Sequence, residues 1–492
     1  MKKKVIIIGS GVAGLATSVR LAKMGYDVHV FESNAYPGGK INSATHGEYR
    51  FDQGPSVFTG PKYLKEIYDL CGEDFSEFEL VPLTTSFNYF FNDGLRMQLS
   101  NKRDEIIDEV SEKLGEDKQV LNAYLDKAAK NYKAIAPMFI EASLHSWKNY
   151  TGKSFFKALG RLSKYKLFST MNEENQKAFR NPKTIQLFNR FASYNGSDPY
   201  QAPAMLNMIG HLEINQTPYL PKNGMIQITD SLFNLAKKHG VEFHFNERVD
   251  KILVDGKIIS GVETQKGQYL SDAVVSNMDV SFTYERLLKE SPRPKPEKTI
   301  QQEKSSSAIV FYWGIKGSFP ELTLHNIFFS DDYKAEFDGI FHTKKPVDDP
   351  TIYVNITSKY VKGDAPEGCE NWFAMINSPV NVGQDWDAEI ARMREKIIAK
   401  INSVLGIDLA ELIEVEEILE PRKIESRYHG KQGSIYGNAS NNRYAAFRRH
   451  PNFSKQFNNL FFVGVSVHPG GGIPLALNSA KIACEYLEKR VG

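Results

Sequence analysis

The sequence predicts an α/β fold of the Rossmann type that is interrupted by an insert of mixed helices and strands. A glycine-rich segment at residues 9–14 follows the apolar run at residues 5–8 and precedes a helix-like stretch that ends near Met24. A second glycine-rich segment lies close to the C-terminus, at residues 468–474. No low-complexity linker divides the chain between them. We therefore expect one core that is built from both ends of the chain.

The N-terminal glycine segment has the order of strand, turn and helix that binds a dinucleotide pyrophosphate. Gly9 permits the tight turn, Gly11 lets the backbone approach the phosphates, and Gly14 lets the helix pack on its strand. Val12 and Ala13 open the helix, where backbone amides are free to bind an anion. Glycine turns before helices also occur in proteins that bind no nucleotide, so this motif by itself leaves both interpretations open.

The second predicted strand supports the dinucleotide interpretation. It covers residues 26–31 and ends at Glu32, about 20 residues beyond the glycines, where a carboxylate accepts hydrogen bonds from a ribose. A carboxylate there argues against a 2′-phosphate on the ligand. The turn at Gly39 and Lys40 follows. Its amides and cationic side chain would meet the ribose or the pyrophosphate, unless the turn is a solvated surface feature.

Residues at three further places along the chain are expected to contribute to this site. Asn277 follows an apolar strand at residues 273–275, either as a contact of the adenosine or as a turn residue. Gly464 ends the last predicted strand, and Gly472 and Ile473 begin the last helix. Glycines let the main chain lie against a flat ring, and amides at the helix start stabilise negative charge on a reduced flavin. The two glycine segments together predict FAD as the cofactor, with a plain capping loop as the alternative.

Composition and charge favour a soluble, multi-domain enzyme of a reducing compartment. The 492 residues include 61 basic and 59 acidic ones, so no overall charge points to nucleic acid. The three cysteines are far apart and odd in number, which fits neither a disulfide framework nor a zinc site, and we expect no metal. The apolar run before Gly9 is too short for a secretory signal, and no stretch reaches the ~18 to 20 apolar residues of a membrane span.

The chain between the glycine segments changes repeatedly between types of secondary structure. Residues 100–185 are rich in helix formers, with a break expected at Pro137, and strand signals dominate beyond about residue 305. We expect this insert to form a substrate cavity over the cofactor. Residues 1–95 are predicted to bind FAD and to begin a substrate domain, and residues 96–215 to form a helical region for substrate and membrane. Residues 216–290 are predicted to bind FAD, residues 291–430 to form a substrate-binding sheet, and residues 431–492 to bind FAD.

Several motifs spread over nearly the whole chain resemble one enzyme family. They lie at residues 51–57, 194–203, 220–225, 274–279 and, most specifically, 459–473. In these segments the chain resembles the bacterial and fungal type of carotenoid desaturase, within the flavin amine oxidase-like group. The resemblance implies a Rossmann-like FAD-binding domain of the flavin amine oxidase and glutathione reductase type. It also implies an interleaved antiparallel sheet for the substrate and a helical part that faces the membrane.

The resemblance also implies roles for single residues. It puts Ser56 and Val57 beside the isoalloxazine and gives the backbone of Val249 a contact with the adenine, although by pattern alone Val249 is more often simple core. The chain departs from the family pattern at Lys40, where Arg is more usual, and at Val465 and Val467, where smaller residues are usual. Such changes are tolerated where backbone amides hold the cofactor, since amides do not depend on the side chain.

The activity that the resemblance implies is an FAD-dependent desaturation in carotenoid biosynthesis. The flavin takes hydride from an allylic carbon, and the adjacent carbon then loses a proton. Because the polyene spreads the positive charge, no strong base is required, and no catalytic residue is assigned. The resemblance favours the C-3′,4′ double bond of a 1′-hydroxylated monocyclic carotenoid such as 1′-hydroxy-γ-carotene. The alternatives are a phytoene desaturase, an amine or porphyrinogen oxidase, and a non-catalytic lipid escort; the electron acceptor is oxygen or a quinone.

Other residues keep two interpretations. For His468 a base beside the flavin and a structural histidine are both open, and for Arg190 and Asp198 a salt-bridged structural role is favoured over one in the cavity.

Residues 147–168 interleave basic side chains with aromatic and aliphatic ones and contain no acid. This pattern is typical of an interfacial membrane helix, with a solvated charged helix as the alternative. We expect a cytoplasmic enzyme that lies peripherally on the lipid of the inner membrane.

Overall fold

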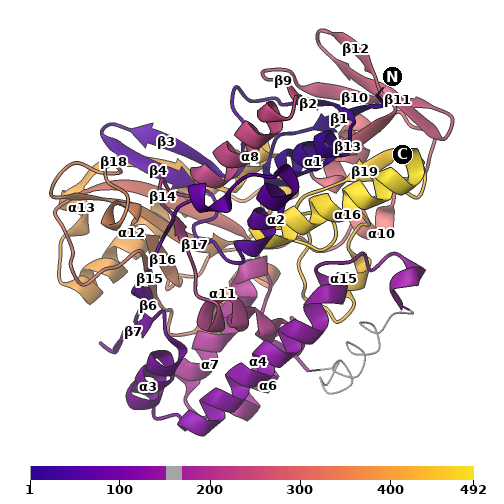
Figure 1. Cartoon of the computed structure of the whole chain (residues 1–492). Helices are drawn as coiled ribbons and strands as arrows, with labels where there is room; N and C mark the ends of the chain where they lie inside the picture. Colours follow the sequence, from indigo (N-terminus) through magenta and orange to yellow (C-terminus); the bar gives the residue numbers. More distant parts are fainter. Residues whose placement is uncertain (1, 151–168) are drawn as a thin grey trace.

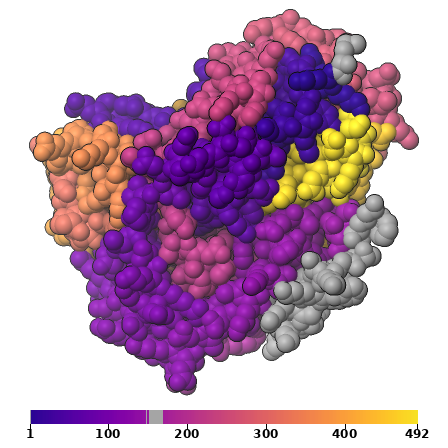
Figure 2. All heavy atoms as spheres, in the orientation of Figure 1, coloured from indigo at the N-terminus to yellow at the C-terminus, as the bar shows by residue number. Residues whose placement is uncertain are grey.

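The computed structural model describes residues 2–150 and 169–492 of the chain. Figure 1 shows that the first and last segments of the chain lie together in one half of the molecule, and in the space-filling view of Figure 2 the indigo N-terminal segment adjoins the yellow C-terminal one. Helix α1 (Val12–Lys23) packs directly on helix α16 (Ile473–Val491). The core is therefore built from both ends of the chain, as predicted.

A parallel sheet lies at the centre of this half. Its strands are β1 (Lys4–Ile8), β2 (Asp27–Phe31), β9 (Glu242–His244), β13 (Ala273–Ser276) and β19 (Leu460–Phe462), in the order β19-β13-β1-β2-β9. Ile7 lies opposite both Val30 of β2 and Val275 of β13. Both faces of a parallel sheet are covered, which explains why β1 and β13 are almost entirely apolar.

Different layers cover the two faces of this sheet. On one face, Ile7 and Val30 belong to the same core as helices α1, α16, α2 (Lys62–Cys71) and α8 (Ile226–Lys238). On the other face, Ile6 and Ile8 pack against a small antiparallel sheet of β10 (Val249–Asp255), β11 (Ile258–Thr264) and β12 (Gly267–Leu270). Successive residues of β1 thus alternate between the two cores.

The insert contains a larger, mostly antiparallel sheet. Its order is β18-β14-β17-β16-β15-β6-β7, and its strands are β6 (Thr85–Phe90), β7 (Arg96–Ser100), β14 (Ser307–Lys316), β15 (His325–Phe328), β16 (Ile352–Asn355), β17 (Cys369–Ser378) and β18 (Ile413–Leu419). Helix α12 (Trp386–Leu405) packs on one face through Trp386, Met393 and Ile397. Strand β4 (Tyr49–Gln53), which pairs with β3 (Asn42–His46), packs Tyr49 and Phe51 near Tyr312 of β14.

Helices form the remaining layer, at the bottom of Figure 1. They are α3 (Arg103–Leu114), α4 (Lys118–Phe139), α6 (Met171–Ala178) and α7 (Pro182–Asn189). The break predicted at Pro137 is wrong, because α4 continues through it to Phe139. A proline removes one helical hydrogen bond, to the carbonyl four residues earlier. Here that carbonyl belongs to the exposed Lys133, so water can satisfy it.

Short elements complete the fold. They are β5 (Leu80–Val81), β8 (Leu220–Pro221), α9 (Val280–Phe282), α10 (Glu297–Ile300), α11 (Tyr333–Asp338), α13 (Leu409–Leu412), α14 (Pro421–Tyr428) and α15 (Ala445–Arg448). Within the two described ranges, no helix has the length and apolar character that a bilayer crossing requires. The predicted fold class is confirmed: an α/β core that is interleaved with an antiparallel sheet and a helical part. The limits of the five predicted segments stay a prediction.

Candidate functional site

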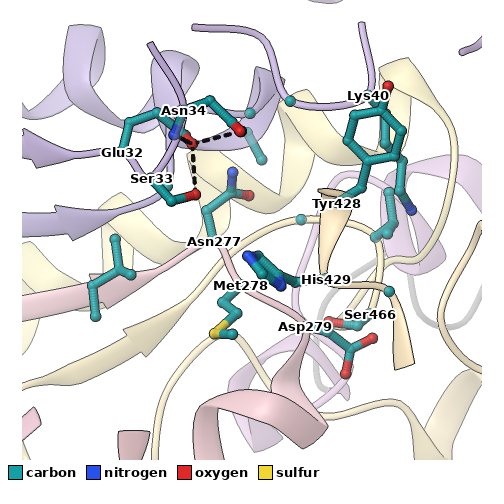
Figure 3. Close-up of a pocket in the computed structure, with 18 of the residues that line it drawn as sticks. Glu32, Ser33, Asn34, Lys40, Asn277, Met278, Asp279, Tyr428, His429 and Ser466 are labelled. Atoms are coloured by element: carbon teal, nitrogen blue, oxygen red, sulfur yellow. Dashed lines mark hydrogen bonds between the residues drawn. The ribbon is translucent and has the colours of Figure 1, made fainter. Parts of the chain in front are cut away.

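A cavity of about 400 Å³ opens at the carboxyl ends of the parallel strands (Figure 3). This is the edge at which open α/β sheets bind their ligands. Most of the residues predicted from the sequence line it, namely Gly9, Gly11, Val12, Ala13, Glu32, Gly39, Lys40, Val249, Asn277 and Gly464. They come from segments at both ends and in the middle of the chain, and the fold brings them together.

The glycines of the first segment are required by close backbone contacts. A Cβ atom at Gly14 would lie 2.2 Å from the carbonyl oxygen of Gly9, so any side chain there would push α1 away from the turn. Gly9 itself has a φ of +91°, which favours glycine. A Cβ at Gly39 would lie 3.2 Å from the Cα of Gly11. The turn at Gly39 therefore packs against the glycine loop, as the dinucleotide interpretation requires.

Asn277 connects the two ends of the site. Its backbone N–H donates to the carbonyl of Ile8 at 2.8 Å, which fixes the residue just beyond β13. Its side-chain nitrogen faces Gly11, where a Cβ would come within 2.7 Å, and its Oδ1 faces Gly464, where a Cβ would come within 2.8 Å. Neither glycine can carry a side chain while Asn277 holds this position.

Glu32 is buried and holds the loops on both sides of it. Its Oε2 accepts hydrogen bonds from the N–H and the Oγ of Ser10, both at 2.8 Å. Its Oε1 accepts from the N–H of Asn34 at 2.9 Å, from Asn34 Nδ2 at 3.0 Å and from Ser33 Oγ at 3.2 Å (Figure 3). The carboxylate thus orders the glycine loop, and a ribose hydroxyl would compete with Ser33 or Asn34 for Oε1.

Lys40 brings a partly buried cation to the cavity. Its Nζ donates to the carbonyl of Ile435 at 2.6 Å. Burial lowers the pKa of Lys40 to about 8, and the nearby carboxylate of Asp279 partly offsets this effect. A bound anion would raise this pKa again and keep the side chain charged, so Lys40 suits a phosphate group.

Several lining residues were not predicted. Arg248, Arg427, His429, Asn34 and Asp279 also border the cavity, and Figure 3 shows Asn34, His429 and Asp279 among its lining side chains. Arg248 directly precedes Val249, which was predicted, so the sequence did indicate this part of the chain. Arg427 and His429 end helix α14, where His429 has a φ of +52°. No motif surrounds them in the sequence, and no signal would have found them.

The other predicted cofactor residues lie outside this cavity. Gly472 directly precedes α16, where a Cβ atom would meet no described atom within 4 Å, and Ile473 is buried in the core against α1. Ala476 of the same helix borders the cavity. Ser56 Oγ lies 2.8 Å from the hydroxyl of Tyr353, and Val57 packs against an aromatic cluster of the insert. Ser56 and Val57 therefore contact the insert, and Ile473 lies one helical turn from the cavity wall.

Three polar residues have structural partners. His468 is buried, its Nε2 faces the carbonyl of Ala142 at 2.8 Å, and burial lowers its pKa to about 3. Arg190 pairs with the carboxylate of Glu213 inside the helical part. Asp198 accepts from the N–H of Tyr200 at 2.8 Å. The contacts of His468 and Arg190 support the structural interpretation of these two residues. Among the described residues Asp198 has hydrogen bonds but no ion pair, so its predicted salt bridge is not found. None of the three lines the cavity.

Comparison with known proteins defines the class of this protein. The family described as flavin containing amine oxidoreductase matches residues 12–487. The chain belongs to this family, and it is an FAD-dependent oxidoreductase.

Individual relatives narrow the class. The chain is 47% identical, over 99% of both sequences, to the 1-hydroxycarotenoid 3,4-desaturase of Flavobacterium sp. (strain P99-3). It is 30% identical, over 100% of this chain and 99% of the relative, to the 4,4′-diaponeurosporene oxygenase of Staphylococcus aureus (strain MRSA252). A solved putrescine oxidase bound to putrescine covers 100% of both chains with a TM-score of 0.63 at 14% identity, a likeness of fold. Among flavin enzymes, the chain is thus a carotenoid desaturase by family, as its motifs predicted.

The predicted membrane segment at residues 147–168 lies for the most part outside the described residues, which resume at Ser169.

Proposed function

We propose that the protein introduces the C-3′,4′ double bond into a 1′-hydroxylated monocyclic carotenoid of the 1′-hydroxy-γ-carotene type. The observation that carries this proposal is the 47% identity, over 99% of both chains, to a 1-hydroxycarotenoid 3,4-desaturase. The oxygenase relative is less similar, at 30% identity.

The cavity fits the adenosine and pyrophosphate of FAD. Gly11 and the first amides of α1 would bind the pyrophosphate, because the first turn of a helix leaves its N–H groups without partners. Lys40 would add a positive charge. Glu32 orders the glycine loop, and its Oε1 would accept a hydrogen bond from a ribose hydroxyl in place of Ser33 or Asn34. Ser56, Val57, Gly472 and Ile473, which lie outside the cavity itself, would contact the ring system.

When bound, FAD supplies the capacity to accept hydride from the substrate. The residues of the chain hold the polyene in position and exclude water from it. His468 is a poor base, because burial lowers its pKa to about 3 and its Nε2 faces the carbonyl of Ala142, where it can only donate. Because the polyene stabilises the positive charge, the proton needs only a weak acceptor.

The test is a comparison of two substrates. The protein with FAD and lipid is incubated with 1′-hydroxy-γ-carotene or with phytoene, and the absorption spectrum and the product mass are recorded. We expect a shift to longer wavelength and a loss of two hydrogens with the hydroxylated substrate alone. A shift with phytoene alone would assign an earlier desaturation. A gain of oxygen would assign an oxygenase, and no change despite bound flavin would direct the search to amines and porphyrinogens.

We also propose that the enzyme works at the cytoplasmic surface of the inner membrane, with oxygen or a quinone as electron acceptor. An exposed patch in the described residues supports membrane contact. Tyr444 and Phe447 of the α15 region are 47% and 45% exposed, and the exposed Arg443 and Arg448 flank them. Phe447 also contacts Phe139 at the end of α4, with ring centroids 5.6 Å apart. Aromatic side chains between basic ones are typical of an interfacial membrane surface.

A further inference from the structure

A cluster of two histidines and a glutamate lies at the edge of the parallel sheet, outside the lining of the cofactor cavity. His29 belongs to β2, and Glu242 and His244 belong to the edge strand β9. His29 is opposite Glu242 in the strand register, and Phe31 is opposite His244. One ligand atom from each of the three side chains lies within 4.8 Å of the others.

The two imidazoles face each other with one nitrogen each. His29 Nδ1 lies 3.2 Å from His244 Nε2, and the ring centroids are 5.5 Å apart with an angle of 15° between the planes. The distance between the ring centroids is the distance between the two nitrogens plus about two ring radii. The rings therefore lie edge to edge in nearly one plane. His29 Nδ1 is also 3.3 Å from Glu242 Oε2. His29 Nδ1 is therefore close to one ligand atom of each of the other two side chains.

The opposite nitrogen of each ring lies near a second carboxylate. His29 Nε2 is 3.3 Å from Asp27 Oδ1, and His244 Nδ1 is 4.0 Å from Glu247 Oε2. The Asp27 carboxylate is close enough to hold the proton on the outer nitrogen of His29, which leaves a lone pair on its inner nitrogen. The Glu247 carboxylate is too far from His244 for a hydrogen bond, and it accepts from Lys266 at 2.8 Å instead. A cation between the two inner nitrogens and Glu242 would use the lone pair of His29.

The separations match a tetrahedral metal site. Zinc bonds to imidazole nitrogen and carboxylate oxygen are about 2.0–2.2 Å long, which puts neighbouring ligand atoms of a tetrahedron about 3.3–3.6 Å apart. The two separations from His29 Nδ1 are close to this range, and the third is within 4.8 Å. We propose that His29, His244 and Glu242 form a binding site for a divalent transition metal, Zn²⁺ above all, with Asp27 as its outer carboxylate. A water would take the fourth position.

The site is suited to a structural role. His244 stacks on Phe31 with centroids 4.3 Å apart, and Phe31 borders the cofactor cavity. A metal bound by β2 and β9 would fasten the edge strand of the sheet and hold Phe31 in place. The inference is independent of the proposed substrate, since no ligand of the site touches the substrate sheet.

The test uses the FAD-loaded protein after dialysis against a chelator. Zn²⁺ is titrated calorimetrically, Co²⁺ is followed by its visible absorption, and the melting temperature is recorded with and without Zn²⁺. We expect about one metal ion per chain and a higher melting temperature with Zn²⁺, since a ligand of the folded state stabilises it. We expect His29→Gln and Glu242→Gln to weaken binding at least tenfold, and Asp27→Asn to weaken it about 10- to 100-fold.

The control is His342→Gln, which removes an exposed histidine from η7 (Gly339–Thr343) and should leave Zn²⁺ binding unchanged. The Glu242 side chain is 64% exposed, so Glu242→Gln keeps the test valid even where a histidine variant fails to fold. Absence of stoichiometric binding, or equal binding by the wild type, His29→Gln and Glu242→Gln, would overturn the proposal. Such a result would mean that the two imidazoles merely share a proton.

Discussion

The Nζ of Lys40 donates a hydrogen bond to the carbonyl oxygen of Ile435 at 2.6 Å. This bond joins the turn after β2 to the segment that leads into the C-terminal glycines. It also holds the lysine at the wall of the cofactor cavity, where burial lowers its pKa to about 8 from 10.5. The charge on Lys40 therefore changes within an accessible range of pH.

The titration of Lys40 affects two quantities in opposite directions as pH rises, namely the stability of the protein without FAD and its affinity for FAD. Without FAD, the unfolded chain binds more protons than the folded one between the two pKa values, so Lys40 makes the protein more stable as pH rises through that window. An FAD pyrophosphate would raise the pKa of Lys40 again. FAD binding should then take up a proton above about pH 8 and weaken as pH rises further.

The measurement is a flavin titration followed by fluorescence from about pH 7 to about pH 10, with proton uptake measured in parallel. Lys40→Met should bind FAD more weakly at the lower pH and lose the dependence on pH. An unchanged pH dependence in Lys40→Met would contradict a contact between Lys40 and the pyrophosphate.

Replacement of Gly14 should abolish FAD binding, whereas replacement of Gly11 should have a milder effect. In Gly14→Ala the new Cβ would meet the Gly9 carbonyl at 2.2 Å, and neither backbone can move without opening the turn. In Gly11→Ala the new Cβ would meet the end of the Asn277 side chain, which can rotate away. The flavin absorbance of the two purified variants measures this difference. Equal flavin content would mean that α1 shifts on its strand at little cost.

Loss of one partner from the buried pair Arg190 and Glu213 should destabilise the helical part. Both side chains are almost fully buried, at 5% and 2% exposure, so either single variant leaves a charge without its partner. The expected cost of Arg190→Met or Glu213→Gln is about 3–5 kcal/mol of unfolding free energy, and the double variant should recover part of it. Urea unfolding measures all three. The exposed pair Lys222 and Glu79 is the control, and its removal should have little effect.

The local parts of the site could be predicted from the sequence, and the distant parts could not. Gly9, Gly14 and Glu32 lie within one strand, turn, helix and strand, so their spacing alone fixes their geometry. Arg427 and His429 reach the cavity from the end of α14, and nothing in their neighbours indicates this. His29 and His244 meet although 215 residues separate them, because β2 pairs with β9. Such a contact follows from sheet order, which a single sequence does not specify.

Replacement of Phe447 by a polar residue should weaken membrane binding without unfolding the protein. Its side chain is 45% exposed between Arg443 and Arg448, so Phe447→Ser removes an apolar contact with lipid but little of the core. Full burial of such a side chain contributes about 1.5–3 kcal/mol, and less than half of Phe447 is exposed, so we expect a loss of roughly threefold to tenfold in vesicle affinity.

Flotation with vesicles that contain anionic lipid measures this affinity, and Phe447→Leu should retain most of it. Ile258, 56% exposed in β11 on the three-stranded sheet, provides the matched control, because Ile258→Ser changes an exposed apolar side chain of another surface. Vesicles without anionic lipid should bind the wild type more weakly, since Arg443 and Arg448 then lose their partners in the headgroups. If Phe447→Ser floats as well as the wild type while Ile258→Ser does not, the membrane surface lies on the three-stranded sheet instead.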